Sequence, residues 1–269
     1  MNVKGALVRW FHFSPAIVWL PLSAMKTSLP SRWSTLFRSG VLLLILAHGT
    51  TGCASARMAV PPSLASVPAL PVSGRQGWKL KESLGFGSFQ VTAVQRSWTR
   101  GSDLQVDAYE RNRRQQTFQF QLSENGTELL SAKAQVNLRR QAVDVGADLE
   151  WQNQSSLEVQ FQSANPVLSG SGVLVLQEQG VRPLSGTLTW SSRIIQVTGT
   201  DRLQGTPLPL GTTSGYVLTW EGRDVAAVDV IDAGQVRLAD GLEASLRAQL
   251  AAAAAALLLL EDLRESLPD

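Results

Sequence analysis

Three pairs of carboxylates stand close enough in the sequence to share one catalytic task. They are Asp144 with Asp148, Asp229 with Asp232, and Glu261 with Asp262. A glycoside hydrolase needs two carboxyl groups roughly 5 to 10 Å apart in a cleft, one as the acid and the other as the base or nucleophile. Spacing along a β-rich chain does not establish such a distance, and acidic pairs are common on protein surfaces. We therefore predict surface pairs and assign no catalytic residue.

The chain offers little other catalytic chemistry. It has one cysteine, Cys53, and two histidines, His12 and His48, both of which precede the cysteine. If the chain is cut at Cys53, the remainder has no histidine. That excludes Ser-His-Asp and Cys-His nucleophile systems, and it excludes zinc sites built from His and Cys. We expect neither a metal nor any other cofactor.

The stretch before Cys53 has the order of a secretory signal. From residue 25 onward, Lys26, Arg32 and Arg38 precede an apolar run at 41–47, and small residues follow up to Gly52. The run is far shorter than the roughly 20 apolar residues that a helix needs to cross a bilayer. We predict that residues 25–52 are a signal peptide and that residues 1–24 are an upstream over-read.

These residues resemble the signal peptides of bacterial lipoproteins, in which a small residue precedes a lipidated cysteine. Gly52 and Cys53 match that pattern, whereas Thr50 stands where the family usually has Leu or another large aliphatic residue. The resemblance implies that Cys53 becomes the new N-terminus and carries a lipid anchor such as palmitate. Ala54, rather than Asp, follows the cysteine, which in a Gram-negative cell implies delivery to the outer membrane. The alternative is an ordinary signal peptide that leaves Cys53 as a single thiol.

The charge and composition of the chain after Cys53 limit the kinds of partner and the number of domains. The whole chain carries a net charge of +2, but acidic side chains outnumber basic ones from Cys53 onward. Such a balance gives no electrostatic basis for nucleic acid binding. Residues 53–76 are rich in Pro, Ser and Ala without periodicity, which predicts the lipidated cysteine followed by a flexible tether. Residues 77–269 are enough for a single domain with a sizeable core.

Basic residues cluster at two places in that domain. Each cluster has acidic residues nearby, so we interpret both as solvated strand ends or turns rather than as an anion-binding surface. The clustered residues are Arg111, Arg113, Arg114, Arg139 and Arg140.

Tryptophan is the remaining residue type that could serve binding. Core packing is its usual fate, but an exposed tryptophan suits a carbohydrate or protein partner. Trp98 lies between Arg96 and Arg100 at the end of a predicted strand. It is therefore our candidate binding residue.

From residue 86 onward the chain has the texture of a β protein. Apolar and polar residues alternate over 88–96 and 117–122, and the dipeptide Asn125-Gly126 predicts a tight hairpin with a return strand at 129–138. Short strands without intervening helices predict an antiparallel sheet of about ten to twelve strands. The further predicted strands are 157–161, 173–176, 187–190, 194–197, 216–220, 225–231 and 235–238.

The C-terminal part differs, because residues 241–267 contain strong helix formers and no proline. We predict one long helix there, with Asp240 as its N-cap and Pro268 as its stop. Every residue from 250 to 260 is Leu or Ala, and a helix that is apolar on all sides must be buried on all sides. The predicted fold is mainly β, an antiparallel β-barrel around a buried C-terminal helix; the alternative is a β-sandwich with the helix on one face.

This order of elements resembles that of tubby-like barrels, in which the final helix threads the barrel. The resemblance covers element order only, and so no functional residue is carried over from it.

The sequence thus predicts a membrane-anchored lipoprotein of a bacterial envelope. We expect a non-enzymatic structural or binding module whose partner is an envelope protein or glycan. One alternative is a carboxylate-dependent hydrolase that acts on envelope glycan. Another is a carrier of lipid or small ligands, which would require the helix to lie outside an open cavity.

Overall fold

The computed structural model describes five stretches of the 269-residue chain: 56–75, 83–106, 109–144, 148–179 and 182–266. The predicted over-read, the predicted signal peptide and the lipid-anchor residue Cys53 lie outside these stretches. Among the described helices, none has the length and apolar character that crossing a bilayer requires.

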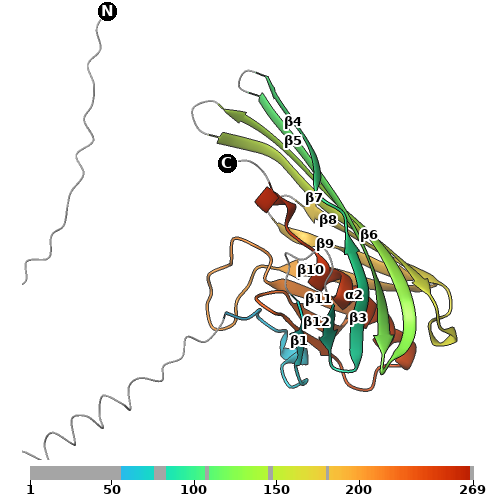
Figure 1. The fold of residues 1–269 in the computed structure, drawn as a ribbon. Coiled ribbons are helices and arrows are strands. Elements are labelled where there is room, and N and C mark those ends of the chain that lie inside the picture. The colour runs from blue at the N-terminus through green and yellow to red at the C-terminus, as the bar shows by residue number, and fades with distance from the viewer. Residues whose placement is uncertain (1–55, 76–82, 107–108, 145–147, 180–181, 267–269) are drawn as a thin grey trace, which may run out of the picture. The chain divides into compact units, whose positions relative to one another are not determined.

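The described residues form thirteen antiparallel strands in one continuous sheet (Figure 1). Neighbours in the sheet follow the order β3-β2-β1-β13-β12-β11-β10-β9-β8-β7-β6-β5-β4. β3 also pairs with β5, which closes twelve strands into a barrel and leaves β4 as a continuation of the sheet along β5. The predicted antiparallel barrel is confirmed. The strands are β1 (Leu70–Ser73), β2 (Leu84–Phe86), β3 (Phe89–Arg96), β4 (Arg100–Val106), β5 (Tyr109–Glu124), β6 (Thr127–Asp144), β7 (Asp148–Ser163), β8 (Ser171–Gln179), β9 (Arg182–Trp190), β10 (Arg193–Thr200), β11 (Gly215–Trp220), β12 (Arg223–Asp229) and β13 (Gln235–Leu238).

The strands follow the alternation of the sequence. Phe118, Phe120 and Leu122 of β5 are buried on the inner face, and the residues between them are exposed on the outer face. Asn125 and Gly126 both have positive φ, 49° and 82°, as the predicted two-residue hairpin turn requires. The hairpin predicted from Asn125-Gly126 is therefore confirmed as part of the barrel wall.

The predicted tether is wrong for most of its length. Within 53–76, the short helix η1 (Pro62–Leu64) and the strand β1 are ordered parts of the barrel. β1 pairs with β2 on one side and with β13 on the other, and it buries Val72. A four-residue strand carries too little periodicity to be recognised, and its stability comes from the two strands beside it.

The segment around η1 covers the outer face of β12. Met58, Leu64 and Val67 are buried there against Ala227. Met58 is also fixed by its backbone N–H, which donates to the Asp229 carboxylate at 3.2 Å. The composition predicts a domain that begins at residue 77. The structure shows that it begins near residue 58.

The helix α2 (Ala244–Leu259) fills the barrel (Figure 1). Residues 251 to 256 are all alanine and have no exposed surface, and they belong to one core cluster with the inward residues of the strands. Alanine lets the surrounding strands approach the helix backbone closely. The predicted enclosure of an apolar helix is confirmed.

The helix is shorter than the predicted range of 241–267. Its N-cap is Glu243 rather than Asp240, and its last residue is Leu259, because the backbone of Leu260 is extended. Arg75 donates hydrogen bonds to the carbonyl of Leu258 at 2.8 Å and to that of Val230 at 2.7 Å. Such bonds satisfy a carbonyl that a continuing helix would otherwise pair. The chain then leaves the barrel and forms the short helix η3 (Leu263–Ser266).

Candidate binding groove on the outer face

The longest strands extend past the barrel on one side. β5, β6 and β7 have 16, 18 and 16 residues, and β4 pairs with the half of β5 that lies farthest from the Asn125-Gly126 turn. Figure 1 shows these strands projecting beyond the helix. We call this projecting part of the sheet the extension; it consists of β4 and of residues 109–116, 136–144 and 148–157.

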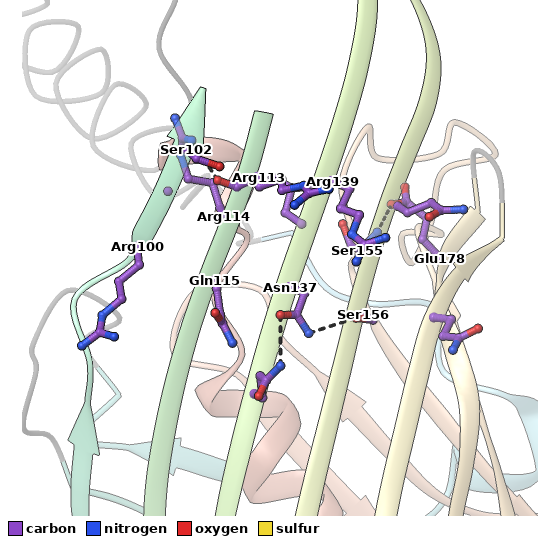
Figure 2. Close-up of a pocket in the computed structure, with 15 residues that line it drawn as sticks. Arg100, Ser102, Arg113, Arg114, Gln115, Asn137, Arg139, Ser155, Ser156 and Glu178 are labelled. Carbon is purple, nitrogen blue, oxygen red and sulfur yellow. Dashed lines mark hydrogen bonds between the residues drawn. The ribbon is translucent and has the colours of Figure 1, made fainter. Parts of the chain in front are cut away.

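The outer face of the extension is hollowed where it meets the barrel. A groove of about 630 Å³ crosses the sheet from β4 to β8 (Figure 2). Residues directly opposite each other on neighbouring strands point to the same face, so the register defines two rows of side chains along the groove. The arginine row is Ser102, Arg113, Arg139 and Gln154, and the amide row is Arg100, Gln115, Asn137, Ser156 and Gln177.

The amide row spans five strands. With roughly 4.8 Å between neighbouring strands, its length is about 19 Å. The Nε2 of Gln135 donates to Oδ1 of Asn137 at 3.2 Å, and Nδ2 of Asn137 donates to the Ser156 hydroxyl at 3.4 Å (Figure 2). These bonds orient neutral groups that can each donate and accept. The row is suited to a ligand that carries many hydroxyl groups.

Three arginines of the groove have no carboxylate partner within the part of the chain that the structure describes. They are Arg100, Arg113 and Arg139, and all three are exposed. Arg113 and Arg139 are directly opposite each other on β5 and β6. Like charges in that relation destabilise a sheet. An anion in the groove would relieve this repulsion.

The carboxylate that lines the groove does not neutralise these arginines. Glu178 pairs with Arg264 of the C-terminal segment and also accepts the backbone N–H of Ser155 at 3.0 Å. The groove is therefore a cationic site with polar surroundings.

Arg114 belongs to the opposite face, where it is buried. Its Nη2 donates to Oδ2 of Asp103 at 3.1 Å, and this bonding holds the pKa of the Asp103 carboxyl below its ordinary value. The arginines at 111, 113, 114, 139 and 140 had been interpreted as strand ends or turns, and that placement is wrong. They lie within β5 and β6, because the two strands are longer than their apolar alternation.

A second hollow of about 570 Å³ continues the groove along the barrel wall. The two hollows share Gln135. The second one is lined by further amides and by the oppositely charged Lys133 and Glu158, with Gln160 donating to Glu158 at 3.2 Å. The excess of positive charge is therefore confined to the part of the groove on the extension.

In the sequence, Trp98 lies between a residue that lines one hollow and a residue that lines the other. Ser97 pairs with Thr117, since its N–H donates to the Thr117 carbonyl at 2.8 Å and its hydroxyl accepts the Thr117 N–H at 2.9 Å. Three residues between β3 and β4 face only two on β5, because Arg96 pairs with Phe118 and Arg100 with Gln115. The extra residue forms a bulge, and Trp98 is 76 % exposed there. Ser97 lines one hollow and Arg100 the other.

The carboxylate pairs lie elsewhere in the described structure. Asp229 is buried, which raises its pKa, and it accepts N–H bonds from Met58 and Ile231, while Asp232 occupies the β12–β13 turn. Asp144 and Asp148 are paired at the end of the β6–β7 hairpin. Asp229 therefore has a structural role, since it fixes the backbone at Met58 and at Ile231.

Glu261 and Asp262 close the mouth of the barrel. Glu261 pairs with Arg96 at 3.2 Å and accepts from Gln116 at 3.0 Å, and Asp262 accepts the backbone N–H of Arg264 at 3.0 Å. A hollow of about 290 Å³ lies behind this segment, and burial raises the pKa of Tyr216 on its wall. The ion pairs of this region hold the C-terminal segment over the helix.

Within the described ranges, no three side chains of His, Cys, Asp or Glu are arranged to hold a metal ion. Comparison of the chain with models of protein families, with curated proteins and with solved structures gives no match. What the structure does show is a twelve-strand antiparallel barrel with a C-terminal helix.

Proposed function

We propose that this chain is a non-enzymatic binding module of a bacterial cell envelope, anchored to a membrane, with the outer membrane favoured, through a lipid on Cys53. The observation that supports binding is the groove of the extension, which collects oriented amides and arginines that no carboxylate among the described residues neutralises. The barrel interior is occupied by α2, so a ligand would bind on the wall and not inside.

The proposed anchor also bears on which side of the barrel would face away from the membrane. Met58 is packed on β12, and only a few residues separate it from Cys53. In the closed ring of twelve strands, β12 and β6 are six places apart and hence opposite. A lipid on Cys53 would therefore hold the β12 side near the membrane and leave the groove on β5, β6 and β7 facing away from it.

The test of the anchor is the intact mass of the protein extracted from membranes of its own host. We expect a species that begins at Cys53 and carries added acyl mass. The variant Cys53→Ala should lose that mass and leave the membrane fraction. An unmodified chain that begins at Met1 or Met25 would overturn the proposed anchor.

The test of the binding role uses the lipidated protein incubated with isolated envelope material. We expect the protein to be retained, and we expect no release of soluble sugar. Release of reducing ends from envelope glycan would contradict the proposal and would support a carboxylate-dependent hydrolase instead.

A further inference from the structure

We propose that the outer groove binds an extended anionic polysaccharide, with Arg113 and Arg139 on its acid groups and Trp98 against a sugar ring. The inference deepens the proposed binding function and rests on it. The ligand class follows from the arginines and amides that line the groove and from the exposed Trp98 beside it.

The acid groups are specified by the arginine row. Guanidinium groups bind carboxylates and phosphates through paired N–H donors. Arg113 and Arg139 are opposite each other on neighbouring strands, and no described carboxylate neutralises them. An acid group between them would accept from both and remove their mutual repulsion.

The hydroxyl groups are specified by the amide row. A polyanion without hydroxyls, such as an acidic peptide, would leave most of these donors and acceptors unused. The amide row is about 19 Å long across five strands, and a sugar chain places hydroxyls along its whole length. The bonds from Gln135 to Asn137 and from Asn137 to Ser156 orient the amides in advance, which lowers the entropic cost of binding.

Trp98 supplies an apolar platform. Its side chain is 76 % exposed on the bulge of the β3–β4 connection, and although Trp98 itself lines neither hollow, Ser97 lines one and Arg100 the other. A bulge commonly re-aims a side chain, and an exposed tryptophan gains contact area against the C–H face of a sugar ring. A surface that binds only anions would not require an aromatic group at this place.

A lipid headgroup is the other source of anions in an envelope. The groove lies on the wall opposite β12, and Met58, which follows Cys53 closely in the sequence, packs on β12. The groove would therefore face away from the anchoring membrane. This placement favours a polymer over the membrane surface as the occupant.

The experiment measures the binding of the purified full-length protein to four probes by calorimetry. The probes are polygalacturonate, its fully methyl-esterified form, polyglutamate, and vesicles that contain phosphatidylglycerol. We expect binding to polygalacturonate, and at least tenfold weaker binding to its ester and to the other two probes.

Substitutions in the groove identify the site. Arg113→Gln with Arg139→Gln should weaken binding to polygalacturonate at least tenfold, and Trp98→Ala should weaken it about fivefold. Matched controls are Arg223→Gln on β12 and Ile194→Ala, whose side chain is 56 % exposed on β10; both should bind as the unmodified protein does. All these residues are exposed, and thermal melting confirms that each variant is folded.

The outcomes separate the inference from the function on which it rests. Equal binding of polyglutamate, with no effect of Trp98→Ala, would replace the glycan by a general anion and overturn the inference. Preference for the vesicles, or no binding to any polysaccharide, would also overturn it, while acylated Cys53 in the intact mass would keep the anchored module. Groove-dependent binding by a chain without acylation would support the ligand and overturn the anchor.

Discussion

The inner face of β5 changes character along the strand. In the half near the Asn125-Gly126 turn, Phe118 and Phe120 are packed in the core around α2. In the half that forms the extension, the corresponding positions are Asn112, Arg114 and Gln116, all buried and polar. The barrel half of β5 is stabilised by apolar burial, whereas its half in the extension depends on strand pairing and on a few polar contacts. The neighbouring strands of the extension still contribute Val136, Leu138 and Leu157 to the core.

The strongest test of this contrast is a charge in the barrel core. Ala253 has no exposed surface, so Ala253→Asp would bury a carboxylate without a partner. We expect a loss of roughly 5 kcal/mol or more in the free energy of unfolding, which is enough to prevent folding. Ala244→Asp, at the exposed start of the same helix, should change it by only about 0.5 kcal/mol. A folded Ala253→Asp variant would show that the helix is not enclosed.

Truncation on the inner face should distinguish the two halves of β5. Phe120→Ala should cost about 3 to 5 kcal/mol, because it removes a large side chain from the packed core. Asn112→Ala should cost only about 1 kcal/mol, since it removes polar contacts from the part of β5 whose inward side chains are polar. Denaturant unfolding of both variants measures the difference. Equal losses would mean that both halves of β5 contribute equally to the core.

Hydrogen exchange gives the same contrast without a substitution. Amides of residues 118–122 should exchange only through global unfolding. Amides of residues 110–114 should exchange roughly 100-fold faster, because the extension can open locally while the barrel stays closed. Uniform protection along β5 would contradict independent opening of the extension.

The ion pair between Asp103 and Arg114 makes the extension sensitive to acid. The folded-state pKa of Asp103 lies below its ordinary value of 3.8, so the pair stabilises the native state at neutral pH. That contribution is lost as the pH falls from about 3.8 through the lower folded-state pKa. The Asp103→Asn variant should therefore be slightly less stable than the unmodified protein at pH 7. The two proteins should have the same free energy of unfolding below the folded-state pKa of Asp103. The effect is small because half of the Asp103 side chain is exposed.

The smallest effect concerns the arginine row, where we expect a gain in stability. Arg139→Gln should raise the free energy of unfolding by about 0.2 to 1 kcal/mol, because it removes a like-charged partner of Arg113. The gain should shrink in high salt, which screens the repulsion. Arg223→Gln serves as the control, and a loss of stability in Arg139→Gln would show that the two arginines do not repel each other.

Much of the barrel could be predicted because its signals are local. Alternation over 117–122 and the Asn125-Gly126 turn depend only on neighbouring residues, and the same is true of the all-apolar run at 250–260. The strands β1, β2 and β4 were missed. β1 and β2 are too short to show a period, and β4 is exposed throughout its length, so none of them has an apolar pattern to detect.

Trp98 was identified as a candidate from its flanking arginines, but its exposure was not determined by them. It depends on the mismatch of one residue between the β3–β4 connection and β5. The groove itself could not be predicted, since its rows combine residues from five strands.

The pairing of Arg113 with Arg139 separates what the sequence determines from what the tertiary structure determines. The sequence by itself determined the strands, their inward faces, the turn and the need to enclose the helix, since each follows from local periodicity. A two-residue turn alone would place Arg113 opposite Leu138, on the wrong face. The observed register shifts by one residue between Leu122 and Ser123, and this shift sets the two arginines side by side. Only the tertiary structure decided that, because a β-bulge is selected by packing across the whole barrel and not by the residues beside it.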